Sequence, residues 1–160
     1  TSTHDMVYHN SAPYEILSTS QLTRAELDHL KRFARFWDLI ANSGNFIDTT
    51  RIILSQEHSA YRAFSTLTRW LYAHFGRTHH IALNDLAEAL LRYLCNECGL
   101  ATRDVGHGIA LDLHRTPGRK TPRFLKPLLD RGWVPPRRQD LGGHLKERQA
   151  RHVLSGADAA

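Results

Sequence analysis

The stretch TRAELDHLKRFARFWDLIANSGN, residues 23–45, decides the fold class of this chain. Thr23 and Glu26 have the spacing of a capping box, in which a hydroxyl and a carboxylate bind free N–H groups at a helix start. Apolar side chains then recur at intervals of three and four: Leu27, Leu30, Ala34, Trp37 and Ala41. The apolar stripe is widened by Phe33, Phe36 and Ile40. We therefore expect a helix packed between partners, ending near Gly44, which suits a left-handed C-cap.

The next segments predict three more helices with short connections. Asp48 is expected to cap a short helix ending at Leu54, and Ser59 to cap the next one, which stops at Gly76. Over residues 82–98 the leucines follow the i, i+3, i+4, i+7 spacing of an amphipathic helix. Four helical segments so close together predict an all-α fold, a compact bundle of four to six helices.

The sequence after the fourth predicted helix has features both for and against another helix. Val105, Ile109 and Leu113 have helical spacing, but Gly106 and Gly108 each cost a helix about 1 kcal/mol relative to alanine. The sequence therefore does not decide whether a fifth helix forms there.

Residues 21–114 form the predicted bundle, and the segments on either side of it are expected to be mainly extended. Residues 1–20 are expected to be extended and to contact a neighbouring domain, because Ala12-Pro13 disfavours helix. Residues 115–160 form a basic arm with a last helix at about 145–154. Five of the six prolines lie in 115–138, which predicts an extended arm rather than a packed layer.

Composition is that of one folded domain. The chain has 160 residues, of which 41% are hydrophobic and 23% charged. No apolar run approaches the length of a membrane span, and the polar start lacks the regions of a signal peptide. Two cysteines are too few for a disulfide framework, so we expect a cytoplasmic protein. The only methionine is Met6, and we expect the chain to be an excised or processed piece.

Charge is distributed unevenly along the chain. Residues 1–100 hold 9 Lys and Arg against 10 Asp and Glu, whereas residues 101–160 hold 12 against 6. This asymmetry indicates either a solvated basic tail or an anionic partner such as RNA. The cations that would bind an anion are Arg115, Arg119, Lys120, Arg123, Arg148 and Arg151.

No complete catalytic or metal-binding motif is present, and we expect this chain alone to have no catalysis. Cys95 and Cys98 form a C-x-x-C, but zinc or an iron–sulfur cluster needs further ligands at compatible spacing. Both cysteines close an amphipathic helix, where small apolar thiols pack well, so they are only weak metal candidates. No glycine-rich phosphate loop and no Gly-x-Ser-x-Gly elbow occurs.

A set of polar and aromatic residues on the first helix has two interpretations. Arg35 and Asp38 stand three apart, as in an ordinary surface ion pair, which is the interpretation that spacing alone favours. The alternative is a docking or substrate-facing surface, whose candidate residues are Arg32, Arg35, Trp37, Asp38 and Asn42.

Several stretches resemble one known family. Residues 12–17 (APYEIL) and 30–46 (LKRFARFWDLIANSGNF) are similar to the C-terminal domain of unknown function of bacterial cobalamin-binding radical SAM proteins. Residues 70–72, 76–79 and 147–152 resemble later stretches of that family. The resemblance is strongest over 12–83, and the string from Phe33 to Phe46 is its most specific part.

The resemblance implies a place in a larger enzyme. In such parents, preceding domains bind cobalamin and a four-iron, four-sulfur cluster that cleaves S-adenosylmethionine. The cluster is held by three cysteines spaced C-x3-C-x2-C, a motif this chain lacks, so no catalytic residue carries over. The leading hypothesis is an accessory domain that caps or supports the radical SAM barrel, or recruits its substrate. The alternative is a helical module that binds nucleic acid or another anionic partner.

Overall fold

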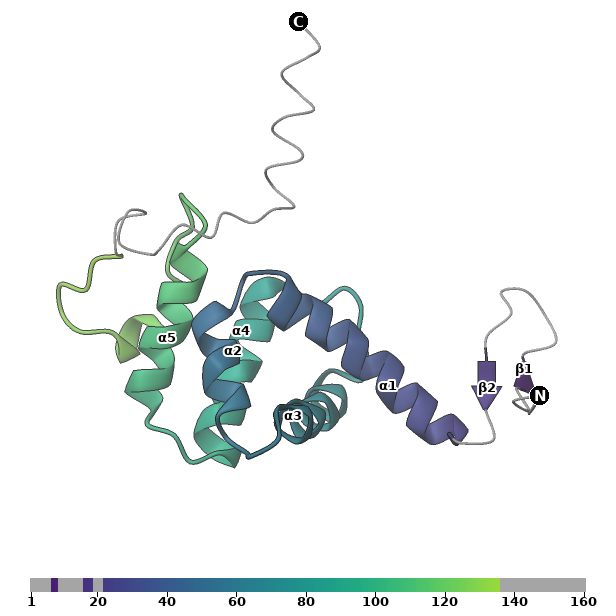
Figure 1. Cartoon of the computed structure of the whole chain (residues 1–160). Helices are drawn as coiled ribbons and strands as arrows, with labels where there is room; N and C mark the ends of the chain where they lie inside the picture. The colour runs from purple at the N-terminus through teal and green to yellow at the C-terminus, as the bar shows by residue number, and fades with distance from the viewer. Residues whose placement is uncertain (1–6, 9–15, 19–21, 136–160) are drawn as a thin grey trace, which may run out of the picture.

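The computed structural model describes residues 7–8, 16–18 and 22–135, which form an all-helical bundle preceded by two very short strands (Figure 1). The α-helices are α1 (Arg24–Trp37), α2 (Ile47–Leu54), α3 (Ala60–Phe75), α4 (Leu83–Arg92) and α5 (Thr102–His114). Two π-helical turns, η1 (Asp38–Asn42) and η2 (Tyr93–Glu97), extend α1 and α4, and a 3-10 turn, η3 (Lys126–Leu128), follows α5. The prediction of an all-α bundle is confirmed.

The described parts of the N-terminal segment are extended, as expected. β1 (Val7–Tyr8) pairs antiparallel with β2 (Ile16–Ser18), and β2 lies beside the start of α1 (Figure 1).

The first helix begins at the predicted capping box. The backbone N–H of Thr23 donates to Glu26 Oε2 at 2.8 Å, and the N–H of Glu26 donates to Thr23 Oγ1 at 3.3 Å. Glycine is needed at position 44 because its φ is +69°, the left-handed region. The helix therefore ends where the pattern predicts.

The expected cap of α2 is wrong. Asp48 lies inside the helix, and the N-cap position is Phe46, which has no side-chain cap hydrogen bond. The carboxylate comes instead from Asp112 on α5, which accepts from the backbone N–H groups of Asp48 and Thr49 at 2.9 and 2.8 Å. A distant acidic residue thus supplies what a local one was expected to supply.

The later helix boundaries follow the turn residues. Ser59 Oγ accepts from the N–H of Arg62 at 3.3 Å, and α3 stops at Gly76 with φ +65°, both as predicted. The 82–98 helix is split into α4 and the π-turn η2, and it too ends at a glycine, Gly99, with φ +70°.

One apolar core joins all five helices. α1 packs on α3, α2 packs on both α3 and α5, and α4 packs on α5 (Figure 1). Fully buried side chains come from each helix in turn: Phe36, Ile53, Phe64, Leu90 and Ile109. This continuity makes residues 24–114 one packed unit.

The fifth helix forms despite its two glycines, and the arm after it packs more closely than expected. Leu125 is fully buried, and Leu128 lies against Gly106, where an added Cβ would come within 3.0 Å of the Leu128 side chain. Asp130 of the arm forms an ion pair with Arg103 of α5. The arm, expected to cross a surface as an extended segment, thus lies against α5 over its described part and buries Leu125 there.

The last predicted helix, at about 145–154, lies outside the described residues. Among the described helices, none combines the length and the apolar character that crossing a membrane would require.

Candidate functional site

Helix α1 carries two neighbouring apolar stripes with different environments. Phe36 and Ile40 are completely buried in the core. Leu30 and Trp37 belong to the second stripe and are only half-buried, while Ala34 is exposed. The wide apolar face predicted for this helix is therefore only partly covered by the bundle.

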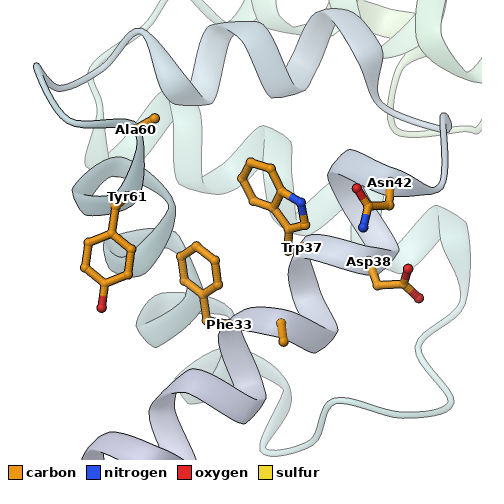
Figure 2. A pocket seen from close by; sticks show the side chains of 7 residues that line it. Phe33, Trp37, Asp38, Asn42, Ala60 and Tyr61 are labelled. Carbon is orange, nitrogen blue, oxygen red and sulfur yellow. The ribbon is translucent and has the colours of Figure 1, made fainter.

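The uncovered stripe lines a groove of about 550 Å³ between the C-terminal half of α1 and the start of α3 (Figure 2). We call it the aromatic groove, and it is lined by Phe33, Ala34, Trp37, Asp38, Asn42, Ala60 and Tyr61. Volumes of this size are typical of pockets that hold a small molecule.

Three rings form the floor of the aromatic groove. The rings of Phe33 and Trp37 are nearly parallel, 7° apart in plane and 5.9 Å between centroids. Tyr61 lies 5.4 Å from Phe33 at a tilt of 32°, and 54% of it is exposed. Buried Phe64 meets Phe33 and Trp37 edge-on, at 5.1 and 4.8 Å, and holds both rings in place.

The polar end of the groove is built on the π-turn η1. Asp38 and Asn42 both project from this turn, on the side away from Tyr61 (Figure 2). π-turns are uncommon and occur frequently at functional sites, because the wider turn redirects side chains. Asp38 Oδ2 lies 3.6 Å from Arg35, whose Nε also donates to the carbonyl of Thr78 at 3.4 Å.

The structure separates the five candidate docking residues. Trp37, Asp38 and Asn42 line the aromatic groove, and Arg35 flanks it through its ion pair with Asp38. Arg32 does not line it, because its guanidinium sits 3.7 Å over the ring of Tyr72. The ion pair between Arg35 and Asp38 therefore forms, at the edge of the groove, and the docking interpretation stays a prediction.

Sequence reasoning missed two parts of the groove. Phe33 was assigned to the core stripe, although its place in the most specific part of the family string was a usable signal. Tyr61 comes from another helix and has no spacing relation to α1, so no local pattern connects it to Trp37.

The C-x-x-C lies in and beside the π-turn η2. Both thiols are free and half-buried. Burial raises the pKa of the Cys98 thiol, while a hydrogen bond with Tyr93 opposes that shift. Burial likewise raises the pKa of the Tyr93 hydroxyl. Within the described residues no group of three or more His, Cys, Asp or Glu side chains is arranged to hold a metal ion.

The candidate anion-binding residues also have different environments. Arg115 Nη2 lies 2.7 Å from Asp48 and its Nε lies 3.4 Å from Asp112, so this cation stabilises the bundle. Lys120 and Arg123 are exposed on the arm and Arg119 is half-buried. Arg148 and Arg151 fall outside the part of the chain that the structure describes.

Comparison with known proteins identifies one family. The family model described as "Protein of unknown function (DUF4080)" matches residues 2–151, nearly the whole chain. No curated protein and no solved structure matches this chain.

Proposed function

This chain belongs to the family described as protein of unknown function (DUF4080), and on that premise we propose that it is an accessory domain of a larger enzyme. The parent is a cobalamin-dependent radical SAM protein, and this domain docks on its barrel or recruits its substrate. Support for the parent comes from the resemblance of residues 12–17 and 30–46 to the domain that follows such barrels.

The observation that carries the docking role is the aromatic groove. It leaves Trp37 of α1 and Tyr61 of α3 partly uncovered, although the neighbouring stripe of α1, with Phe36, is buried in the core. Exposed aromatic surface next to polar groups is typical of sites that bind another protein. A domain with this surface positions a neighbour, or a substrate, without supplying reactive groups of its own.

The cofactors of the proposed parent do not fit this chain. A four-iron, four-sulfur cluster of the radical SAM type needs three cysteines, and the sequence holds two. S-adenosylmethionine, the cluster and cobalamin would therefore be bound by the preceding domains, and no step of their chemistry passes through the residues described here.

The test uses the longer polypeptide that contains this chain. The purified parent should hold iron, sulfide and cobalamin, and should cleave S-adenosylmethionine reductively. Deleting residues 22–135 should lower substrate turnover, and Tyr61→Ala, an exposed change that leaves the core intact, should lower it without loss of cofactor. A parent without the cluster, or turnover unchanged in both variants, would refute the proposal.

A second candidate function follows from the arm. We propose that residues 115–135 contribute to binding an anionic partner such as RNA. Leu125 and Leu128 fix the arm on α5, so exposed Lys120 and Arg123 are held at defined positions instead of on a free tail. A fixed set of cations binds phosphates at a smaller entropic cost than a free tail does.

A further inference from the structure

We propose that the aromatic groove binds a lysine or arginine side chain presented by a protein segment. The aliphatic stem of that side chain lies over the rings and its cationic group points toward Asp38. This inference rests on the docking role proposed above and names the chemistry of the partner.

The three aromatic rings of the groove offer their faces to a cation. Phe33, Trp37 and Tyr61 lie side by side in one view of the groove, with interplanar angles of 7° and 32° between neighbours (Figure 2). Ring faces of aromatic side chains carry negative potential and attract cations within about 6 Å of the centroid. A platform of three similarly oriented rings therefore favours a cationic group or the methylene stem that carries it.

Asp38 places a carboxylate at one end of the groove. Its side chain is 38% exposed, and Oδ2 lies 3.6 Å from Arg35 Nη1, a long distance for an ion pair. Oδ1 accepts no hydrogen bond from any residue in the described ranges 7–8, 16–18 and 22–135. A second donor can therefore approach this carboxylate from the groove, where the Asn42 amide lies one turn further on (Figure 2).

Other occupants fit the groove less well. A wholly apolar segment would bury the Asn42 amide and would desolvate the Asp38 carboxylate with only the distant Arg35 beside it, at a cost of roughly several kcal/mol. An anionic group would meet the Asp38 charge directly. Only an amphipathic cation satisfies the apolar floor and the acidic end together.

The shape of the groove favours a side chain on a polypeptide. Its volume of about 550 Å³ exceeds that of one lysine or arginine, so neighbouring residues of a segment fit beside it. Tyr61, at the end away from Asp38, is 54% exposed and leaves that end open to a passing chain.

The experiment selects peptides from a randomised ten-residue phage library on the 160-residue chain. Enriched peptides should share a lysine or arginine beside apolar residues. A synthetic copy should bind about tenfold more weakly when its arginine is replaced by neutral citrulline, or its lysine by norleucine. Asp38→Asn should weaken the charged peptide several-fold and leave the neutral peptide unchanged, whereas Tyr61→Ala should weaken both.

Glu88→Gln is the matched control, because Glu88 pairs with Arg92 on α4, outside the aromatic groove, and its variant should bind like the original chain. Circular dichroism checks that each variant keeps its helices. No enriched peptide, enriched peptides without a cation, or equal affinity of charged and neutral copies would overturn the inference. Since the selection uses this chain alone, its failure is distinguishable from unchanged turnover of the parent, which would refute the docking role instead.

Discussion

Asp112 and Thr49 are joined by two short hydrogen bonds although 63 positions separate them. Asp112 Oδ2 accepts from the backbone N–H of Thr49 at 2.8 Å and from its hydroxyl at 2.7 Å. The carboxylate is 1% exposed and also binds the N–H of Asp48. One side chain of α5 therefore caps α2 and places a negative charge at the positive, N-terminal end of that helix. The same bonds fix the angle between the two helices.

Replacing Asp112 by alanine should destabilise the fold strongly. The change leaves two helix N–H groups and a buried hydroxyl without acceptors, and it removes a partner of Arg115. We expect the free energy of unfolding in urea to fall by roughly 2–4 kcal/mol. Asp104→Ala, on the exposed first turn of the same helix, is the control and should cost less than about 1 kcal/mol. Equal losses in both variants would contradict the capping role.

The two glycines of α5 should respond to alanine with opposite signs. A Cβ at Gly108 makes an ordinary contact, 3.4 Å from Ile52, so Gly108→Ala should raise the free energy of unfolding by about 0.5–1 kcal/mol. A Cβ at Gly106 meets two atoms of Leu128 at 3.0 Å. Gly106→Ala should therefore displace η3 and lower stability by roughly 1 kcal/mol, despite the better helix propensity. Thermal unfolding of the two variants measures the difference. Stabilisation by both substitutions would show that η3 can move away from α5 without loss of stability.

The contributions of His29 and His114 to stability should fall as the pH drops from about 7 toward 5. Burial lowers the pKa of His29, helped by the charges of Arg69 and Arg32, and burial lowers the pKa of His114, helped by Arg119. A lowered pKa means that the unfolded chain binds more protons in this window, so acidification favours unfolding.

Glutamine at these positions removes the titration and retains a polar partner for Ser65 or Thr121, which now bond to the two rings. His29→Gln and His114→Gln should each flatten the dependence of stability on pH, measured by urea unfolding across that range. His58→Gln, at an exposed position, should leave the slope unchanged, and a slope that is the same in all three variants would refute the assignment.

Local sequence patterns predicted the helices and several of their ends. Contacts between residues far apart in the sequence decided the features that those patterns did not predict, such as the cap of α2. The Thr23–Glu26 box and the glycines at 44 and 76 act within one turn of the chain, so their positions alone located helix ends. The cap of α2 depends on Asp112, which no local pattern connects to that helix.

The candidate site shows the same limit. Periodicity identified Trp37 as apolar and helical, and the family string pointed to Asp38 and Asn42, but spacing alone assigned Phe33 to the core. Tyr61 completes the groove only because α3 packs against α1. The burial of Leu125 was not predicted either, because the prolines around it indicated an extended segment on the surface.

Cys98 should react slowly with thiol reagents. Because burial raises its pKa, less thiolate is present near neutral pH, and the thiolate is the nucleophile. In a Cys95→Ser variant, iodoacetamide at about pH 8 should modify Cys98 at least roughly threefold more slowly than it modifies N-acetylcysteine. Mass spectrometry follows the reaction, and unfolding in concentrated urea should remove the difference. A fast native reaction would indicate an activated thiol and would reopen a redox role for the pair.

Binding of an anionic polymer should depend on the arm and on salt. If Lys120 and Arg123 each contact a phosphate, the double change Lys120→Glu and Arg123→Glu should weaken tRNA binding strongly at low salt. It should also reduce the slope of log affinity against log salt by about 2, since each contact releases roughly one counterion. Arg51→Glu, an exposed cation on α2, tests whether total charge alone matters, because it changes net charge but lies outside the arm. Fluorescence anisotropy with labelled tRNA measures both quantities. Equal loss per unit charge in the Arg51 variant would mean that the arm has no special role, and the absence of binding by the original chain at low salt would refute the anionic partner.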